Sequence, residues 1–159
     1  MKIVAFGGSI RSTGRGIASV MDLISECEDH KDIASKAPKY IEEGRLSNSE
    51  ITAAAALLGA KQCGAEIEYF PLRKLFKRKE EKVENLDHDK LKLDEGIAYV
   101  DTLAMDEKGL EALYKAVETA DGVILSTPVY FGDRSSVANK LLQLTNKFRL
   151  LENKPFGVV

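Results

Sequence analysis

Short apolar runs alternate with segments of helical periodicity along this chain, and this alternation limits the folds that it can adopt. The predicted strands, each a short apolar run, are 2–6, 66–70, 123–127 and 155–159. The predicted helices, each with apolar residues at helical spacing, are 47–63, 109–119 and 135–148. Strands that alternate with helices are typical of parallel β-α-β units with right-handed crossovers. The sequence therefore predicts an α/β fold built on a doubly wound parallel sheet.

Two long segments interrupt the alternation. Residues 12–44 separate the first strand from its expected helix, and they contain a helical repeat of their own. Residues 73–107 hold the run KRKEEK, whose interleaved charges favour a solvated surface. We expect one domain, 1–159, with insertions at about 12–44 and 73–107. The final run, PFGVV, is expected to open a buried strand, so the sheet is expected to be truncated after its fourth strand.

Composition and charge exclude several classes of protein. The formal net charge of −2 and the balance of charges give no field that would attract nucleic acid. The two cysteines are isolated and the two histidines have no partner cluster at ligand spacing, so no metal site is predicted. The N-terminal apolar run is too short for a signal peptide or a membrane span. We expect a cytoplasmic protein with reduced thiols and no membrane partner.

The loop after the first strand has the composition of a phosphate-binding loop. Gly7 and Gly8 allow positive φ and close approach of the backbone, while Ser9 and Arg11 add a hydroxyl and a forked cation. The loop is not a Walker A motif, because no GK[ST] follows it. An ordinary tight turn is the alternative interpretation.

Three short polar residues, Ser47, Asn48 and Ser49, begin the helix predicted at 47–63. Ser47 and Glu50 have the spacing of a capping box, and Gly64 stands where the helix is expected to stop. Capping alone explains Ser47. However, the first N–H groups of a helix also favour an anion, so the cap can face a phosphate as well.

The loop after the third strand carries two aromatic residues where small polar residues are usual. It runs Thr127, Pro128, Val129, Tyr130, Phe131, Gly132. Aromatic faces and main-chain groups of such a loop can bind a flat heteroaromatic ring, and a glycine lets the ring lie against the backbone. The alternative is that the aromatic residues plug the end of the sheet or an oligomer interface.

Together the segments GGSIRS, LSNSEI and ADGVILSTPVYFG resemble the flavodoxin-like NAD(P)H-dependent FMN reductases. The resemblance covers most of 1–11, 45–72 and 116–159, and it implies a flavodoxin-like fold that binds FMN. The residues that it implies for the FMN phosphate are Ser9, Arg11, Ser47, Asn48 and Ser49. The residues that it implies for the flavin ring are Thr127, Pro128, Val129, Tyr130, Phe131 and Gly132.

The resemblance also implies an activity. An FMN-dependent oxidoreductase of this kind takes a hydride from NADPH or NADH and passes electrons to a small acceptor, such as a quinone or free flavin. The cofactor carries this chemistry, so we name no catalytic side chain. Relatives usually form dimers or tetramers, which implies a homo-oligomer. Two alternatives remain: a flavodoxin-like FMN electron carrier that serves protein partners, and a domain that binds another phosphorylated ligand or merely assembles.

Overall fold

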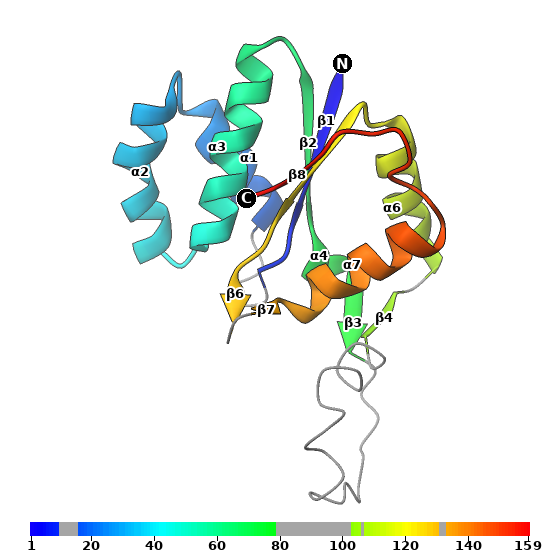
Figure 1. The fold of residues 1–159 in the computed structure, drawn as a ribbon. Coiled ribbons are helices and arrows are strands. Elements are labelled where there is room, and N and C mark those ends of the chain that lie inside the picture. The colour runs from blue at the N-terminus through cyan, green and yellow to red at the C-terminus, as the bar shows by residue number, and fades with distance from the viewer. Residues whose placement is uncertain (10–15, 79–102, 106, 131–132) are drawn as a thin grey trace, which may run out of the picture.

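The fold is a four-stranded parallel sheet covered by helices on both faces (Figure 1). The computed structural model describes residues 1–9, 16–78, 103–105, 107–130 and 133–159. The strands of the sheet are β1 (Lys2–Gly7), β2 (Glu66–Pro71), β5 (Gly122–Ser126) and β8 (Phe156–Val158). All four predicted strands are therefore confirmed, and no strand end shifts by more than one residue.

The strand order is β2-β1-β5-β8, and every neighbouring pair is parallel. This is the order of the first four strands of a flavodoxin-like sheet, so the predicted fold class is confirmed. From β1 the chain moves outward to β2 and then crosses back to β5 on the other side. Such a sheet binds its ligands at the carboxyl ends of the two strands where the direction of winding reverses. Here those strands are β1 and β5.

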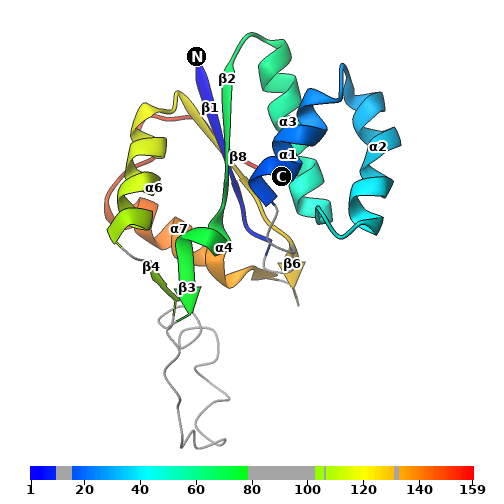
Figure 2. The same cartoon turned by 180° about the vertical axis from the view of Figure 1, so that it is seen from behind.

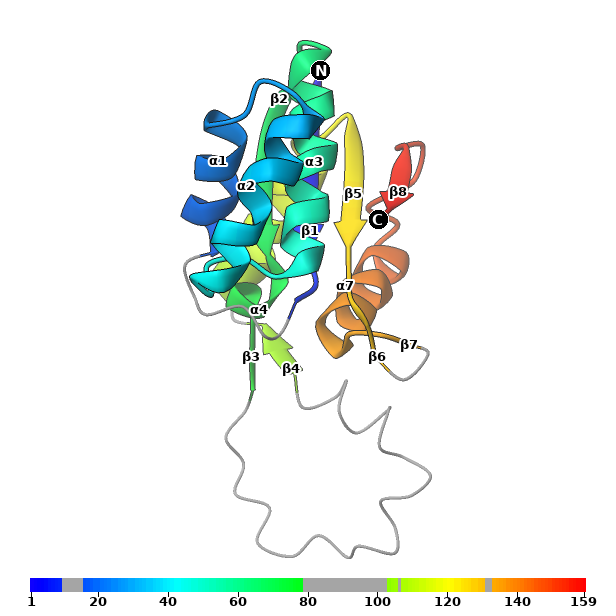
Figure 3. The same cartoon turned by 90° about the vertical axis from the view of Figure 1, so that its left-hand side faces the viewer.

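Three helices cover one face of the sheet (Figures 1 and 3). They are α1 (Gly16–Ser25), α2 (His30–Glu42) and α3 (Asn48–Gln62). The core between them and the strands includes Ala5, Leu23, Leu57 and Tyr69. The segment 12–44 therefore contributes two helices: α1, which was predicted, and α2, which was not. α2 packs against α1 and α3 as an outer layer.

The caps predicted for α3 are both present. Ser47 is the N-cap, and its side chain forms the reciprocal capping box with Glu50. Gly64 follows the C-cap with a φ of 82°, which a glycine adopts without strain. Local signals at both ends of this helix therefore determine where it begins and stops.

Helices α4, α6 and α7 cover the opposite face (Figure 2). Their bounds are Leu72–Leu75, Glu107–Thr119 and Ser136–Lys147. The core on this side includes Val4, Phe6, Leu113, Val123 and Leu141. Since Val4 and Phe6 face this core while Ala5 faces the other, β1 is buried on both faces, as its unbroken apolar sequence predicts.

The segment 73–107 is described only in part. It includes β3 (Phe76–Arg78) and β4 (Leu103–Met105), which pair antiparallel outside the main sheet. Residues 79–102, which contain most of the charged run, lie outside the described residues. The interpretation of that run as a solvated surface therefore stays a prediction.

Strand β8 corrects one expectation. The run at 155–159 was expected to be a buried strand, but Phe156 is 38% exposed and Val158 is 61% exposed. β8 is the edge strand of the described sheet and pairs only with β5 there. An apolar sequence therefore predicted the strand correctly and its burial incorrectly, because burial depends on what packs against the edge.

Candidate functional site

The loops that follow β1 and β5 lie side by side at the carboxyl edge of the sheet. Gly7 is paired with Ser126 in the parallel register. One residue further on, the N–H of Gly8 donates a hydrogen bond of 2.6 Å to the main-chain oxygen of Ser126. The two loops that the sequence singled out therefore leave the sheet next to one another.

The amino end of α3 joins the same edge (Figure 3). The Ser126 hydroxyl donates a 2.5 Å hydrogen bond to the main-chain oxygen of Ser49, in the first turn of α3. Ser126 is fully buried. Three segments that are far apart in sequence, those at Gly8, Ser49 and Ser126, are thus tied together by two hydrogen bonds.

Gly8 is needed here for close approach. A Cβ atom at this position would lie 2.9 Å from Oγ1 of Thr127 and 3.1 Å from Oγ of Ser135. The Ser135 hydroxyl also donates to the main-chain oxygen of Gly8 at 2.6 Å. The sequence suggested positive φ as a second reason for Gly7 and Gly8, but among the described glycines only Gly44 and Gly64 have it.

The hydroxyl groups at the start of α3 differ in their partners. The N–H and the O–H of Ser47 both donate to Oε2 of Glu50, each at 2.8 Å. Glu50 is only 1% exposed, so this is a buried carboxylate held by the cap. The hydroxyl of Ser49 lies 3.2 Å from that of Ser47. Because Ser47 has one hydroxyl hydrogen and Glu50 accepts it, Ser49 is the donor in this longer contact, and it would bind a ligand by turning its hydroxyl away from Ser47.

The chemistry of these donors fits a phosphate group. The first N–H groups of an α-helix have no acceptor within the helix, and the helix dipole places partial positive charge there. In α3 these groups belong to Asn48 and Ser49, next to the Ser49 hydroxyl. Ser9, which follows the loop glycines, is 3% exposed. Arg11 lies outside the described residues.

The aromatic loop begins as a two-stranded ribbon. β6 (Val129–Tyr130) pairs antiparallel with β7 (Asp133–Arg134), which the sequence did not predict. Val129 is 69% exposed, and Thr127 and Pro128 are half-buried. The side chain of Tyr130 and all of Phe131 and Gly132 lie outside the described residues.

The main chain of this loop limits where a ring could be held. The N–H of Thr127 donates to the main-chain oxygen of Val159 at 3.3 Å, so it is already occupied. Pro128 has no N–H. Within this loop, main-chain donors to the polar edge of a flat ligand must therefore come from residues beyond Pro128.

Two polar residues at this edge, Ser126 and Ser135, were not predicted from the sequence to belong to the site. Ser126 interrupts the apolar run of β5, and a buried hydroxyl inside such a run is a signal because it needs a partner. Ser135 is the N-cap of α7 and is 2% exposed. The position of Ser135, just before a helical repeat, predicts a cap, but nothing local predicts its bond to Gly8.

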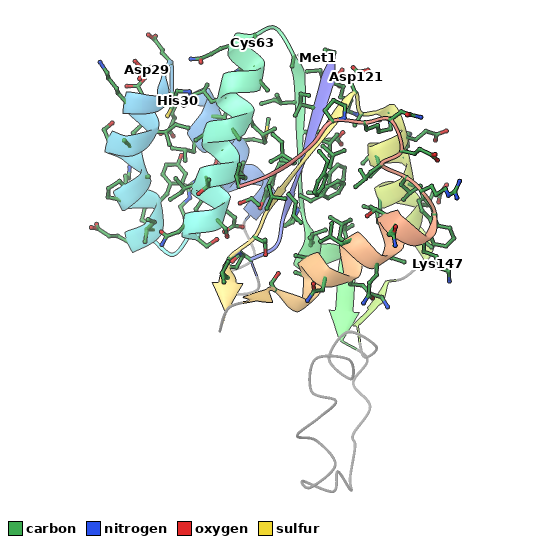
Figure 4. The ribbon with its side chains drawn as sticks, viewed as in Figure 1. Met1, Asp29, His30, Cys63, Asp121 and Lys147 are labelled. Carbon is green, nitrogen blue, oxygen red and sulfur yellow. The ribbon has the colours of Figure 1, made fainter. Side chains whose placement is uncertain are left out.

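Other reactive side chains lie away from this edge (Figure 4). His30 and Cys63 lie toward the opposite edge of the molecule, where Met1 and Asp121 are also found. Within the described ranges, no cluster of three or more His, Cys, Asp or Glu side chains could hold a metal ion. A surface groove that includes Leu142, Leu151 and Phe156 contains none of the predicted site residues.

Comparison with known protein families identifies the family of this chain. The sequence matches the family of NADPH-dependent FMN reductases over residues 42–159, more than half of the chain. The chain belongs to this family. The family predicted from three short motifs is thereby confirmed. A search of curated proteins finds no match.

The family match begins at the last residue of α2. It includes Ser47–Ser49 and the loop after β5, whereas Ser9 and Arg11 precede it. The family is one of flavin-dependent NAD(P)H reductases, so FMN and a nicotinamide nucleotide are its cofactor and co-substrate. In the part of the chain that the structure describes, none of the helices has the length and apolar character needed to cross a membrane.

Proposed function

We propose that this protein is an FMN-dependent oxidoreductase that passes electrons from NAD(P)H to a small acceptor, such as a quinone or free flavin. One observation carries the proposal. Ser126 is hydrogen-bonded to both Gly8 and Ser49, so the loop after β1, the start of α3 and the loop after β5 meet at one point. That point is the edge where a flavodoxin-like sheet binds its ligand.

The proposed cofactor contacts divide into two groups. For the FMN phosphate they are Ser9, Arg11, Ser47, Asn48 and Ser49. For the flavin ring they are Thr127, Pro128, Val129, Tyr130, Phe131 and Gly132. Within the first group, we propose that Ser49 exchanges its 3.2 Å bond to Ser47 for a bond to the phosphate, while Ser47 acts mainly through the cap because its hydroxyl is bonded to the Glu50 carboxylate at 2.8 Å.

These two groups of contacts would have different roles in the chemistry. Bound FMN would supply the hydride and electron transfers, and the protein would position it and tune it. The start of α3 would fix the phosphate end by charge and hydrogen bonds. The exposed side chain of Val129 would offer apolar surface at the ring end.

The experiment that tests the proposal is a visible spectrum of the purified protein, taken before and after addition of FMN and then of NADPH. Flavin bands that remain after gel filtration and are bleached by NADPH are expected. A protein that stays colourless and free of flavin after FMN addition contradicts the proposal. Turnover of NADPH with a quinone separates a reductase from an electron carrier, which would turn over only with a protein partner.

A charge-removal variant tests the phosphate end. Arg11→Ala should weaken FMN binding by about 1.5–3 kcal/mol, the value of a hydrogen bond to a charged group. Lys147→Ala is the matched control, because it also removes one positive charge and lies at the far end of α7 (Figure 4). Unchanged FMN affinity in Arg11→Ala would disprove the role of Arg11.

Three further expectations belong to this proposal. We propose one FMN-binding domain spanning 1–159, a homo-oligomer, either dimer or tetramer, and a location in the cytoplasm with no nucleic-acid partner. The free thiols Cys27 and Cys63 are compatible with a reducing compartment. Light scattering during gel filtration measures the oligomeric state, and a monomeric mass would refute the second expectation.

A further inference from the structure

Ser126 holds two neighbouring segments through two different parts of the same residue. Its main-chain oxygen accepts the N–H of Gly8, and its backbone is paired with Gly7 in the sheet. Its hydroxyl, in contrast, donates to the main-chain oxygen of Ser49, 77 positions earlier in the chain. The backbone therefore secures the loop after β1, and the side chain secures the start of α3.

The hydroxyl is not needed for packing. The other residues of β5 are apolar or glycine, and an alanine at 126 would fill almost the same space. Burying a hydroxyl costs free energy unless it is hydrogen-bonded, and Ser126 is fully buried. The carbonyl of Ser49 already has a helical partner at residue 53, as α-helix geometry requires. The bond from Ser126 is therefore an additional hydrogen bond, and it holds the first turn of α3 in position against the end of β5.

We infer that Ser126 is a positioning residue for the phosphate end of the cofactor site. By holding the Ser49 carbonyl, it places the N–H groups and hydroxyl of the first turn of α3 against the loop after β1. It touches neither phosphate nor ring through its side chain. This inference rests on the proposed function, because the phosphate in question is that of FMN.

The test compares two ligands that differ only in the phosphate. FMN and riboflavin share the flavin ring, so the ratio of their dissociation constants measures the contribution of the phosphate. Titration of each ligand, followed by quenching of flavin fluorescence, gives this ratio for wild type and for Ser126→Ala. The variant should bind FMN roughly five- to tenfold more weakly, the effect of about one lost hydrogen bond, and riboflavin within about twofold of wild type.

Two more variants serve as a control and as a second test of the comparison between FMN and riboflavin. Thr145→Val is the matched control: Thr145 is 3% exposed, and its hydroxyl bonds only locally, to the Leu142 oxygen at 3.1 Å within α7. It should leave both affinities unchanged. Ser126→Cys keeps a side chain of similar size with a much weaker donor. It should show the same selective loss if Ser126→Ala does not fold, which thermal melting monitors.

The outcomes separate the two proposals. If wild type prefers FMN over riboflavin but the Ser126 variants keep the full preference, the positioning role is wrong and the proposed function stands. Equal losses for both ligands also overturn the role, because they place the effect at the ring or on the whole fold. If wild type shows no preference for FMN, the phosphate site itself is refuted, and the role of Ser126 with it.

Discussion

The capping box at Ser47 gives the sharpest test of how the start of α3 is built. Ser47→Ala removes a hydroxyl that donates to Oε2 of Glu50 at 2.8 Å and accepts the Glu50 N–H at 3.4 Å. Loss of an N-cap side chain costs about 1 kcal/mol. Loss of a hydrogen bond to a charged group costs about 1.5–3 kcal/mol, although the Ser47 N–H remains as a second donor to this carboxylate.

Because the two contributions share one hydroxyl and overlap, we expect a total loss of about 2–3 kcal/mol in the free energy of unfolding. For a chain of this size, each kcal/mol lowers the melting temperature by roughly 2–4 °C, so a decrease of about 4–12 °C is expected. Thermal unfolding followed by far-UV circular dichroism measures it, and urea unfolding at 25 °C gives the free energy directly.

Ser49→Ala is the control, two positions away in the same turn. The described hydrogen bond of the Ser49 hydroxyl is to Ser47 at 3.2 Å, and Ser49 is half-buried. We expect less than about 1 kcal/mol of destabilisation, together with the larger loss of FMN affinity relative to riboflavin. A Ser47→Ala protein that melts within a degree of wild type would refute the reasoning, as would equal destabilisation by both variants.

Three other predictions concern single residues. Gly8→Ala should cost about 1–3 kcal/mol, measured by urea unfolding, because its Cβ would lie 2.9 Å from a neighbouring hydroxyl oxygen. Burial, and then the hydrogen bond to Glu26, raises the pKa of Tyr40 to about 12. Its contribution to stability is therefore complete below pH 10 and is lost as the pH rises to about 12, a dependence that Tyr40→Phe should abolish. A maleimide should label Cys63 but not the buried Cys27, whose pKa is raised by desolvation, and mass spectrometry of the folded protein would show this.

Local signals predicted the strands of the main sheet and the helices α1, α3, α6 and α7, whereas α2 and the β6-β7 ribbon were not predicted. Ser47 and Gly64 mark the ends of α3 correctly, because a cap involves only residues within one turn. The apolar run of β1 also correctly predicted burial on both faces, because its successive apolar side chains point to opposite faces of the sheet. In contrast, the exposure of β8 depends on its place at the edge of the sheet, which no run of apolar residues records.

In the candidate site, too, local sequence signals predicted some features and long-range contacts determined others. The residue types in the loops after β1 and β5 indicated a ligand, and the roles predicted for those residues stay predictions. The bonds that join those loops, from Ser126 to Ser49 and from Ser135 to Gly8, connect residues 77 and 127 positions apart. Such bonds become predictable only after the strand order is known. Gly8 illustrates the point, since its sequence suggested positive φ and the structure requires it for close approach to Thr127.

The insertion at 12–44 separates the two segments of the proposed phosphate site, the loop after β1 and Ser47–Ser49. The question is what holds these two segments together. Tyr40, which is 1% exposed in α2, provides part of the answer. Its main-chain oxygen accepts the N–H groups of Arg45 and Leu46, at 2.9 and 3.2 Å, and its ring lies under the Arg45 guanidinium at 4.3 Å. The returning chain is thus fixed immediately before Ser47.

Because the chain is fixed at that point, the length of the insertion has little effect on the position of the start of α3. The entropic cost of closing a loop grows only slowly with its length, so a long insertion is tolerated if its ends are held. One end is held by β1 in the sheet, and the other by Tyr40 and by the bond from Ser126 to Ser49. Helices α1 and α2 can therefore be added over α3 without separating Ser47–Ser49 from the loop after β1.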